Sequence, residues 1–403
     1  MRFLLLTQYY PPEPGAASLR LEAMAHELML KGHTVTVVSA KAHHLGAHQN
    51  RMDSSRDVVR GVPVLRTWIW RVSTGRFWLR LLNYFSFVIT GFWGMLRSPR
   101  PDYVIVESPP LFLGLAAYWY KQIFKIPYIL SVSDLWPESA VALGLVRNRL
   151  LIRVTQMLER MLYRHAAFVS GVTEGICQTV RETGVIPAHR VLFFPNGVDT
   201  QLFHRVSPSN ELVSHLNVRD KKVFLYPGTL GYAQGLEIIL DAAEVLRDRD
   251  DVVFLLVGEG PMRQKLETEV ARRQLANVLF EPLQPVHRMA AYFSLARAVV
   301  VPLRHHPLFR GARPSKVFPA WAVRCPVIFA GEGEMADLVE KSGGGVVVPP
   351  EDAGGLAMAV EFLANITDWE WENMGSQGYQ FVMDHYTWPR IADQWLSGLE
   401  TGG

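Results

Sequence analysis

The strongest chemical signal in this sequence is a group of cations between two apolar segments. The apolar segments are residues 298–303 and 326–330, and the cations are Arg304, His305, His306, Arg310, Arg313 and Lys316. Each apolar run predicts a buried strand, and a short apolar helix is expected after Pro314-Ser315-Lys316. Ligands of α/β sheets bind where a strand ends and a helix begins, and a helix N-terminus favours anions. A solvated basic loop is the alternative, but the position between two core strands favours an anion site.

Two glycine-containing turns in the same half of the chain point to the same kind of ligand. Each follows a predicted strand, at 223–226 and at 252–257. The turn residues are Gly228, Thr229, Gly231, Gln234 and Gly235 after the first strand, and Gly258, Glu259, Gly260 and Pro261 after the second. Glycine lets backbone N–H groups approach a diphosphate. One such turn is weak evidence for a diphosphate site. Two halves of the chain that are built in the same way are stronger evidence.

The first half of the chain places a carboxylate at a similar point. Asp134 comes directly after a strand predicted for 128–132. There it could bind a sugar hydroxyl or take a proton, or it could cap the next helix. Arg20 lies one turn into an amphipathic helix predicted for 18–31, so it either points to the same edge or is a solvated helix charge.

Composition and charge exclude several other classes of protein. The chain has 403 residues, 49% of them hydrophobic, and a net charge of +3. This length suits two domains, and the charge is too small to indicate nucleic-acid binding. Cys177 and Cys325 provide neither a disulfide framework nor metal-ligand spacing, which fits a reduced cytosolic setting. We interpret the acidic residues of 248–251 as part of a solvated turn and therefore expect no metal site. The first residues lack the pattern of a signal peptide.

The order of predicted elements indicates two α/β halves. The first half starts as strand 2–8, a loop, helix 18–31 and strand 34–39, without the G-x-G-x-x-G spacing of an NAD site. We therefore expect two Rossmann-like doubly wound domains that face a ligand cleft. The expected bounds are 1–205 for the first domain and 206–385 for the second. Residues 386–403 form a last helix that crosses back to the first domain or docks within the second.

The segment 76–100 has an unusual composition for a soluble domain. Residues 81–96 carry no charge, whereas Arg71, Arg76, Arg80, Arg97 and Arg100 flank them. Sixteen residues are fewer than the ~20 that a spanning helix needs. As a helix, the run places Asn83, Ser86, Thr90 and Gly94 on one narrow stripe and apolar side chains elsewhere. It is either a buried core helix or, as its many aromatic residues favour, a helix that lies in a membrane surface.

Several short motifs occur in an order that is more specific than any one of them. They are Tyr9-Tyr10-Pro11-Pro12-Glu13-Pro14-Gly15 with Arg20, Gly32-His33-Thr34-Val35, Ser108-Pro109-Pro110-Leu111, Asp134-Leu135-Trp136-Pro137-Glu138, Pro195-Asn196-Gly197-Val198-Asp199, Gly258-Glu259-Gly260-Pro261, Pro314-Ser315-Lys316 and Cys325-Pro326-Val327-Ile328. With these motifs the chain resembles the retaining glycosyltransferases of the GT-B fold, similar to family 4 and its bacterial surface-polysaccharide branch. The resemblance covers nearly the whole chain, and it implies that the first domain binds the acceptor and the second binds the nucleotide sugar.

The resemblance implies metal-independent transfer of a hexose or N-acetylhexosamine from a nucleotide diphosphate sugar, expected to be UDP-linked, onto a polyprenyl-diphosphate-linked saccharide. The nucleotide sugar is a substrate, so no cofactor is expected. The location implied is the cytoplasm, peripheral on the inner face of the cell membrane. The candidate catalytic residues are Asp134, Lys316 and Arg313. The donor-binding candidates are Gly228, Thr229, Gly231, Gln234, Gly258, Glu259, Pro314 and Ser315, and the acceptor-side candidates are Tyr9, Glu13, Gly15 and Arg20.

The sequence also departs from the family pattern. The family's Glu-x7-Glu pair is replaced by Gly311 and Pro319. Pro319 requires a helix that starts within about one turn before it or kinks there. The Arg and Lys that often follow the first glycine turn are missing too, and Gln234 stands near the place of the lysine. A sugar-nucleotide-binding scaffold without activity is therefore the second hypothesis. An epimerase of the same fold is a third, for which no set of carboxylates and histidine can be placed.

Overall fold

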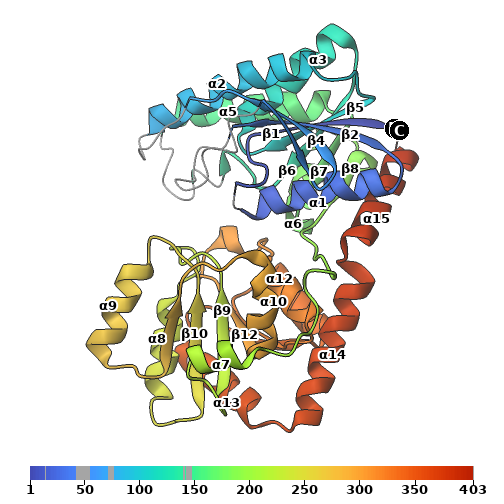
Figure 1. Cartoon of the computed structure of the whole chain (residues 1–403). Coiled ribbons are helices and arrows are strands. Elements are labelled where there is room, and N and C mark those ends of the chain that lie inside the picture. Colours follow the sequence, from blue (N-terminus) through green and yellow to red (C-terminus); the bar gives the residue numbers. More distant parts are fainter. Residues whose placement is uncertain (14, 42–54, 71–76, 139–140, 142–147, 403) are drawn as a thin grey trace. The chain divides into compact units, whose positions relative to one another are not determined.

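The computed structural model describes residues 1–13, 15–41, 55–70, 77–138, 141 and 148–402, and these form two compact units (Figure 1). Met1–Asn196 and Trp388–Gly403 make up the first unit, and Gly197–Thr387 makes up the second. Each unit contains a mainly or wholly parallel sheet with helices on both faces. The predicted pair of Rossmann-like doubly wound domains is thus confirmed.

The sheet of the first unit has, among the described residues, eight strands in the order β3-β4-β2-β1-β5-β6-β7-β8. The strands are β1 (Arg2–Thr7), β2 (Thr34–Ala40), β3 (Arg56–Val59), β4 (Val62–Thr67), β5 (Tyr103–Ser108), β6 (Tyr128–Val132), β7 (Phe168–Gly171) and β8 (Val191–Phe193). All neighbours pair in parallel except β3 and β4, which are antiparallel. The carboxyl ends of β1, β5 and β6 therefore lie at one edge of the sheet, where Gln8, Pro109 and Ser133 begin the loops.

Alternate residues of the central strands fill two cores on opposite faces of this sheet. Leu4 and Leu6 of β1 pack under α2 (Phe77–Leu96), α3 (Gly114–Phe124), α5 (Arg149–His165) and α6 (Glu174–Glu182). Phe3 and Leu5 pack under α1 (Ala16–Leu30) and α15 (Trp388–Gly402). The continuous apolar runs of the sequence arise because a parallel strand is covered on both faces.

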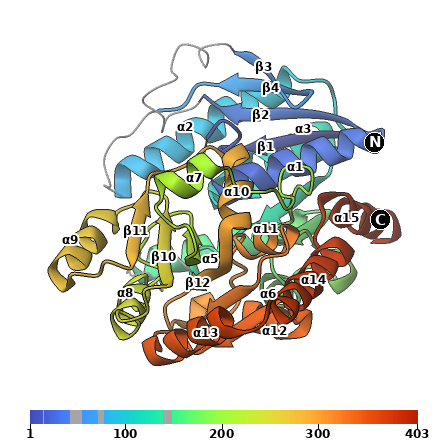
Figure 2. The ribbon, with the colours of Figure 1, turned by 60° about the horizontal axis from the view of Figure 1, so that its bottom comes forward.

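The second unit has, within its described part, six parallel strands in the order β11-β10-β9-β12-β13-β14. They are β9 (Lys222–Pro227), β10 (Val252–Val257), β11 (Val278–Glu281), β12 (Ala296–Pro302), β13 (Val327–Ala330) and β14 (Gly345–Val348). One face is covered by α8 (Glu237–Val245), α9 (Arg263–Arg273) and α13 (Ala353–Asn365). The other is covered by α7 (Asn210–His215), α10 (Val286–Leu295), α11 (Val317–Ala322), α12 (Glu334–Ser342) and α14 (Asp368–His385), with α14 beside α11 (Figure 2).

The boundary predicted after residue 205 is wrong, because the segment from Gly197 already belongs to the second unit. Val198 is buried in the core of that unit, and its amide donates to the carbonyl of Tyr386 at 2.9 Å. Phe203 packs edge-on against Phe293, with ring centroids 5.8 Å apart. The polar composition after residue 206 marks a surface turn of the second unit and not the linker.

The last helix packs on the first unit, which is the first of the two alternatives that the sequence left open. Figure 1 shows α15 beside α1, and the two are joined by a Lys31–Asp393 ion pair of 2.6 Å. Trp395 is 1% exposed, and its indole N–H donates to Ser170 Oγ at 3.1 Å. The predicted start at residue 386 is two residues early, because Tyr386 packs against Phe318 of the second unit, with ring centroids 4.9 Å apart.

Candidate functional site

The two glycine turns of the second unit are joined backbone to backbone at the carboxyl edge of its sheet. The amide of Gly228 donates to Val257 O at 2.8 Å, and the amide of Leu230 donates to Glu259 O at 2.9 Å. Gly258 has a φ of +151°, and a Cβ there would lie 1.9 Å from Gly228 O. Only glycine allows this approach. Among the described residues, the amides of Thr229 and Gly231 donate no backbone hydrogen bond, so they remain candidates for anion contacts.

Lys316 extends from the start of α11 to the first of these turns. A Cβ on Gly228 would lie 2.9 Å from Lys316 Cε and 3.3 Å from Nζ. The ammonium also lies 4.9 Å from the ring centroid of Tyr226, within cation–π range. Burial lowers the pKa of Lys316 to about 8. Within the described part of the chain, no carboxylate forms an ion pair with Lys316.

The other cations of this segment are held by carboxylates of the second unit. Arg304 pairs with Glu237 at 3.0 Å, and its Nε donates to Tyr232 O at 2.7 Å. His305 lies 3.1 Å from Glu332, and Arg310 lies 3.8 Å from the same side chain. The predicted cluster of anion-binding cations is therefore largely compensated, and Arg304 serves to fix the first glycine turn.

Arg313, predicted to share the diphosphate with Lys316, is mostly buried in a different pair. Its side chain is 7% exposed and contacts Glu334 at the start of α12. Arg313 Nη1 donates to the hydroxyl of Tyr386 at 3.2 Å. Sequence reasoning missed Glu334, although its position directly after β13 and a glycine turn could have indicated it. The guanidinium supports the loop that carries Lys316, and a direct contact with a ligand stays a prediction.

The remaining donor-side candidates surround the glycine turns or precede Lys316. The Gln234 side chain lies over Gly231, where a Cβ would come 2.6 Å from Gln234 Oε1. Glu259 is exposed and pairs with Arg263 at 2.9 Å. Pro314 and Ser315 are partly buried in the turn before α11, whose third residue is Pro319. The helix thus begins within one turn of the proline, as predicted.

Arg263, which the sequence did not indicate, closes the second glycine turn. Its Nη1 donates to Gly258 O at 2.7 Å and to Glu281 O at 2.9 Å. Gly258 is the first residue after β10, and Glu281 is the last residue of β11. An arginine at the start of a helix after a glycine turn is a weak signal, because its partners are backbone atoms that lie outside its own helix.

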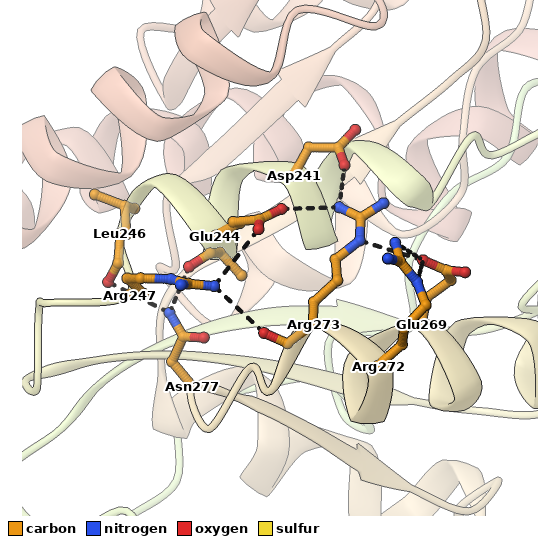
Figure 3. Close-up of polar contacts among 9 residues, drawn as sticks. Asp241, Glu244, Leu246, Arg247, Glu269, Arg272, Arg273 and Asn277 are labelled. Atoms are coloured by element: carbon orange, nitrogen blue, oxygen red, sulfur yellow. Dashed lines mark hydrogen bonds and ion pairs between the residues drawn. The ribbon is translucent and has the colours of Figure 1, made fainter.

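A second arginine network ties together α8 and α9, the helices that follow the two glycine turns (Figure 3). Arg273 Nη1 contacts Asp241 and, at 3.3 Å, Glu244 of α8. Arg273 Nε lies 3.3 Å from Glu269 of its own helix, and Arg247 donates to Arg273 O at 3.3 Å. The network fixes α8 against α9 and so stabilises the relative position of the turns.

A cavity of about 570 Å³ opens beside the carboxyl end of β11. Its lining includes Glu281, which contacts His215 at 3.1 Å, and Tyr292. Glu211, Gln284 and His287 complete its polar wall. Its volume falls within the range of ligand sites in proteins, which is about 300–1,000 Å³.

On the first unit, the loop from Tyr9 to Gly15 is held by an arginine that sequence reasoning did not select. Arg66 at the end of β4 is 6% exposed; its Nη2 contacts Pro11 O, and its guanidinium lies 6.0 Å from the ring centroid of Tyr10. Tyr9 is partly exposed, whereas Glu13 is 4% exposed. Gly15 precedes α1 with a φ of +142°. Of the predicted acceptor-side set, Tyr9 and Gly15 are thus accessible and Glu13 is not.

Arg20 is neither a solvated helix charge nor open to a ligand. It is 2% exposed, and its Nη2 lies 2.6 Å from Glu107 Oε1. The predicted contact of Arg20 with an acceptor is therefore corrected to a buried ion pair. Glu107, which sequence reasoning missed, is the charged residue of an otherwise apolar strand, and a charge in such a run requires a partner.

Asp134 lies two residues beyond the end of β6 and is exposed. It therefore stands at the carboxyl edge of the sheet, as predicted, beside the Arg20–Glu107 pair that reaches Ser133. Among the described residues, no group of three or more His, Cys, Asp or Glu side chains has an arrangement that could hold a metal ion.

The helix α2 has one face buried in the core and one exposed apolar face. Phe87, Val88 and Met95 are buried in the core of the first unit, while the opposite side exposes Leu82, Phe85, Ile89, Trp93 and Leu96. The predicted polar stripe faces the chain after β4: Asn83 Nδ2 donates to Trp70 O at 2.6 Å, and Thr90 Oγ1 donates to Trp68 O at 2.6 Å.

The apolar surface continues beyond the helix. Trp68 and Trp70 are more than half exposed, with ring centroids 6.2 Å apart, and α3 adds Trp119 and Ile123. Arg97 and Arg100 are exposed after α2, while Arg71 and Arg76 lie outside the described residues. Among the described residues, no helix is both long enough and apolar enough to cross a membrane.

Comparison with known protein families places a family domain on each unit. Residues 15–197 match the model of the glycosyl transferase 4-like domain, and residues 221–365 match that of the glycosyl transferases group 1. A putative colanic acid biosynthesis glycosyl transferase of Escherichia coli is 27% identical over 89% of this chain and 91% of its own length. An O-antigen chain mannosyltransferase of Escherichia coli is 30% identical over 40% of this chain and 42% of its own.

Solved structures agree with the fold. A sucrose-phosphate synthase from Thermosynechococcus elongatus superposes with a TM-score of 0.78 at 20% identity, covering 100% of this chain and 98% of its own. Anabaena HepE in complex with UDP and glucose gives 0.75 at 19% identity, with both chains fully covered. The structural likeness confirms the GT-B fold, and the family matches confirm the predicted class of enzyme.

Proposed function

We propose that this chain, a glycosyltransferase of the GT-B fold, transfers a sugar with retention from a nucleoside diphosphate sugar to a lipid-linked saccharide in the synthesis of a bacterial surface polysaccharide. The observation that carries the proposal is Lys316, which lies against Gly228 and has no carboxylate partner in the described part of the chain. A cation of this kind beside two glycine turns suits a diphosphate.

The donor is proposed to be a UDP-sugar held at the carboxyl edge of the second sheet. The diphosphate lies along the turn that contains Gly228, Thr229 and Gly231, with Lys316 as its charged partner. The cavity beside Glu281 is the proposed place of the nucleoside, since it opens at the end of β11 on the same edge. HepE, a structural neighbour, binds UDP and glucose, which supports this choice of nucleotide.

Metal-independent transfer then requires that protein groups stabilise the leaving diphosphate. The bond from the sugar C1 to the diphosphate oxygen breaks, and a bond from C1 to the acceptor oxygen forms. Negative charge accumulates on the departing phosphate, where Lys316 stabilises it more strongly than in the ground state. The acceptor proton passes to that phosphate when the new bond forms on the same face of the sugar.

The acceptor is proposed to bind at the carboxyl edge of the first sheet, near Tyr9, Gly15 and Asp134. Asp134 is exposed at this edge and orients an acceptor hydroxyl by accepting its hydrogen bond. The relative from the colanic acid system and the O-antigen mannosyltransferase support an acceptor from surface-polysaccharide synthesis.

A lipid-linked acceptor keeps its reacting end at the membrane surface, so the enzyme is proposed to bind there from the cytoplasm. The exposed face of α2, together with Trp68 and Trp70, supplies apolar and indole side chains of the kind that enter the headgroup region. Arg97 and Arg100 supply charge for anionic lipids, at about 1 kcal/mol for each surface arginine. The binding is reversible, because the helix lies on the surface.

A scaffold without activity is the second candidate, favoured by Gly311 and Pro319 at the positions of the family's glutamate pair. A donor screen distinguishes the two. Purified enzyme is incubated with each UDP-sugar and a membrane extract, and release of UDP is measured. Turnover that requires both donor and extract supports the transferase. Tight UDP binding without turnover for any donor would refute it and leave the scaffold.

A further inference from the structure

A buried charged cluster lies at the carboxyl edge of the first sheet, directly before Asp134. Arg20 of α1 and Glu107 of β5 form an ion pair of 2.6 Å, and their side chains are 3% and 2% exposed. Arg20 Nη2 also lies 2.5 Å from Ser133 Oγ. Ser133 Oγ in turn donates to Glu107 Oε1, so the three side chains form a closed triangle.

The triangle fixes the point at which the Asp134 loop leaves the sheet. Ser133 follows β6, and its amide donates to Ser108 O at 2.8 Å, which ties it to the end of the adjacent strand β5. The side chain of Ser133 is held by one group from α1 and one from β5. The next residue in the chain is Asp134, so the rotation of its backbone is constrained from three elements.

Stability alone is a poor explanation for this cluster. Burial removes the hydration of both charges, and the free energy gained from their attraction only roughly offsets that cost. A protein with an apolar pair of similar volume in this place is often as stable or more stable. Glu107 Oε2 is also buried and has no hydrogen-bond partner among the described residues. An unsatisfied buried oxygen in a native protein calls for an explanation, and function is one.

We propose that Arg20, Glu107 and Ser133 are positioning residues that hold Asp134 in place for the acceptor hydroxyl. The inference rests on the acceptor-side role proposed for Asp134. The ion pair itself touches neither donor nor acceptor. Its charges compensate each other, so it sets the direction of the Asp134 carboxylate without adding net charge to the acceptor side.

The test replaces the pair by apolar residues, Arg20→Met with Glu107→Leu, in the full-length enzyme. Because no uncompensated charge remains, the variant should fold with a melting temperature close to that of the wild type. Transfer to the lipid-linked acceptor should fall about 100-fold through kcat, the size of effect that a misplaced reacting group produces. UDP affinity, measured by calorimetry, should not change. Glu107→Gln, which keeps the shape and can accept both hydrogen bonds, should retain most of the rate, although its melting temperature should fall because the buried Arg20 charge loses its carboxylate.

A double-mutant cycle with Asp134→Asn distinguishes a positioning role of the Arg20–Glu107 pair from a purely structural role. If the pair acts through Asp134, replacing the pair in the Asp134→Asn background should cost no further rate. Independent, multiplying losses would overturn the inference, as would a folded variant with wild-type kcat. The matched control is the exposed pair Arg2–Asp102, 2.7 Å apart at the opposite edge of the same sheet. Its replacement by Arg2→Gln with Asp102→Asn should leave transfer unchanged.

Crystal structures of the wild type and the pair variant provide a second test, which does not depend on activity. The inference expects Asp134 to be displaced or to adopt several conformers in the variant. An unmoved Asp134 would overturn it. If the wild type transfers no sugar to any acceptor, the proposed function fails by itself, and the position of Asp134 still decides whether the pair holds it.

Discussion

The side chain of Lys316 covers the Cα of Gly228, so that a Cβ at Gly228 would lie 2.9 Å from Lys316 Cε and 3.3 Å from Nζ. The lysine therefore reaches across the end of β9 only because the first turn residue has no side chain. This contact joins two segments, the glycine turn and the Pro314-Ser315-Lys316 motif, that the sequence separates by almost 90 residues.

Gly228→Ala should weaken UDP binding by displacing Lys316. The φ of +122° makes alanine strained at this position, which should also lower the free energy of unfolding by about 1–3 kcal/mol. Calorimetry with UDP and urea unfolding measure the two effects. Gly311→Ala, in the loop before Lys316, is the control, because a Cβ there meets no atom within 4 Å. Equal UDP affinity for Gly228→Ala and the wild type would contradict the proposed path of the diphosphate.

Replacement of Lys316 should mainly affect UDP binding, whereas replacement of Arg313 should mainly affect stability. Lys316→Ala should weaken UDP binding by about 1.5–3 kcal/mol, the range for hydrogen bonds to charged groups. Arg313→Ala should mainly destabilise the second unit, by about 3 kcal/mol, because it removes the guanidinium that pairs with the mostly buried Glu334 carboxylate. Calorimetry and urea unfolding of both variants decide the assignment. Unchanged UDP affinity in a folded Lys316→Ala variant excludes Lys316 from the diphosphate site.

The pKa of Lys316 predicts a pH dependence of donor binding. Burial lowers this pKa to about 8, so the side chain loses its proton in the free enzyme as pH rises above that value. A bound diphosphate stabilises the charged form and raises the pKa again. UDP binding at pH 9 should therefore take up about one proton, and affinity should fall about tenfold per pH unit above 8. Calorimetry in buffers of different ionisation enthalpy measures the uptake, and Lys316→Met should abolish it.

Stability of the first unit should decrease as pH rises through the neutral range, because of Glu159. Burial, opposed by the hydrogen bond from Tyr163 and assisted by the charge of Glu138, raises the pKa of Glu159 to about 7 from 4.5. Between these values the folded state keeps a proton that the unfolded state has lost, so unfolding becomes easier with increasing pH, by about 3 kcal/mol in total.

Urea unfolding from pH 5 to 8 tests this effect in Glu159→Gln, which should remove most of the decrease. Glu182→Gln on the exposed side of α6 is the control and should keep it. A wild-type stability that is flat or rising over this range would show that Glu159 is ionised in the folded protein.

Membrane binding should depend on the exposed apolar face of α2. Phe85→Ser with Trp93→Ser removes two side chains that are 41% and 58% exposed, so folding should be little affected. Flotation with vesicles that contain anionic lipid should show strong binding of the wild type at low salt and weaker binding at high salt. The variant should bind weakly at both. Met358→Ser with Phe362→Ser, which changes two apolar side chains of α13 that are 66% and 50% exposed, should bind as the wild type does.

A wild type that floats equally well with neutral lipid, or a variant that binds like the wild type, contradicts the membrane proposal. The exposed face of α2 would then be a contact for another protein or for a second copy of the chain.

The local sequence determined the fold class and the place of Lys316. Continuous apolar runs that end in glycine, proline or aspartate predict parallel strands and the loops at their carboxyl ends, because a strand buried on both faces has few polar positions. The motif order identified the family. These features depend on neighbouring residues in the chain and on the regular geometry of strands, which sequence patterns encode directly.

Only the tertiary structure decided which charges remain for a ligand. Arg20 meets Glu107 across 87 residues of sequence, and Arg313 meets Glu334 on the next helix, so both predicted ligand-binding arginines are paired with a carboxylate inside the protein. The polar stripe of α2 is satisfied by backbone of residues 68–70, and Gly197 to Arg205 belong to the second unit. The order of strands in each sheet decides which residues become partners. It brings together residues whose spacing in the chain does not indicate that they are in contact.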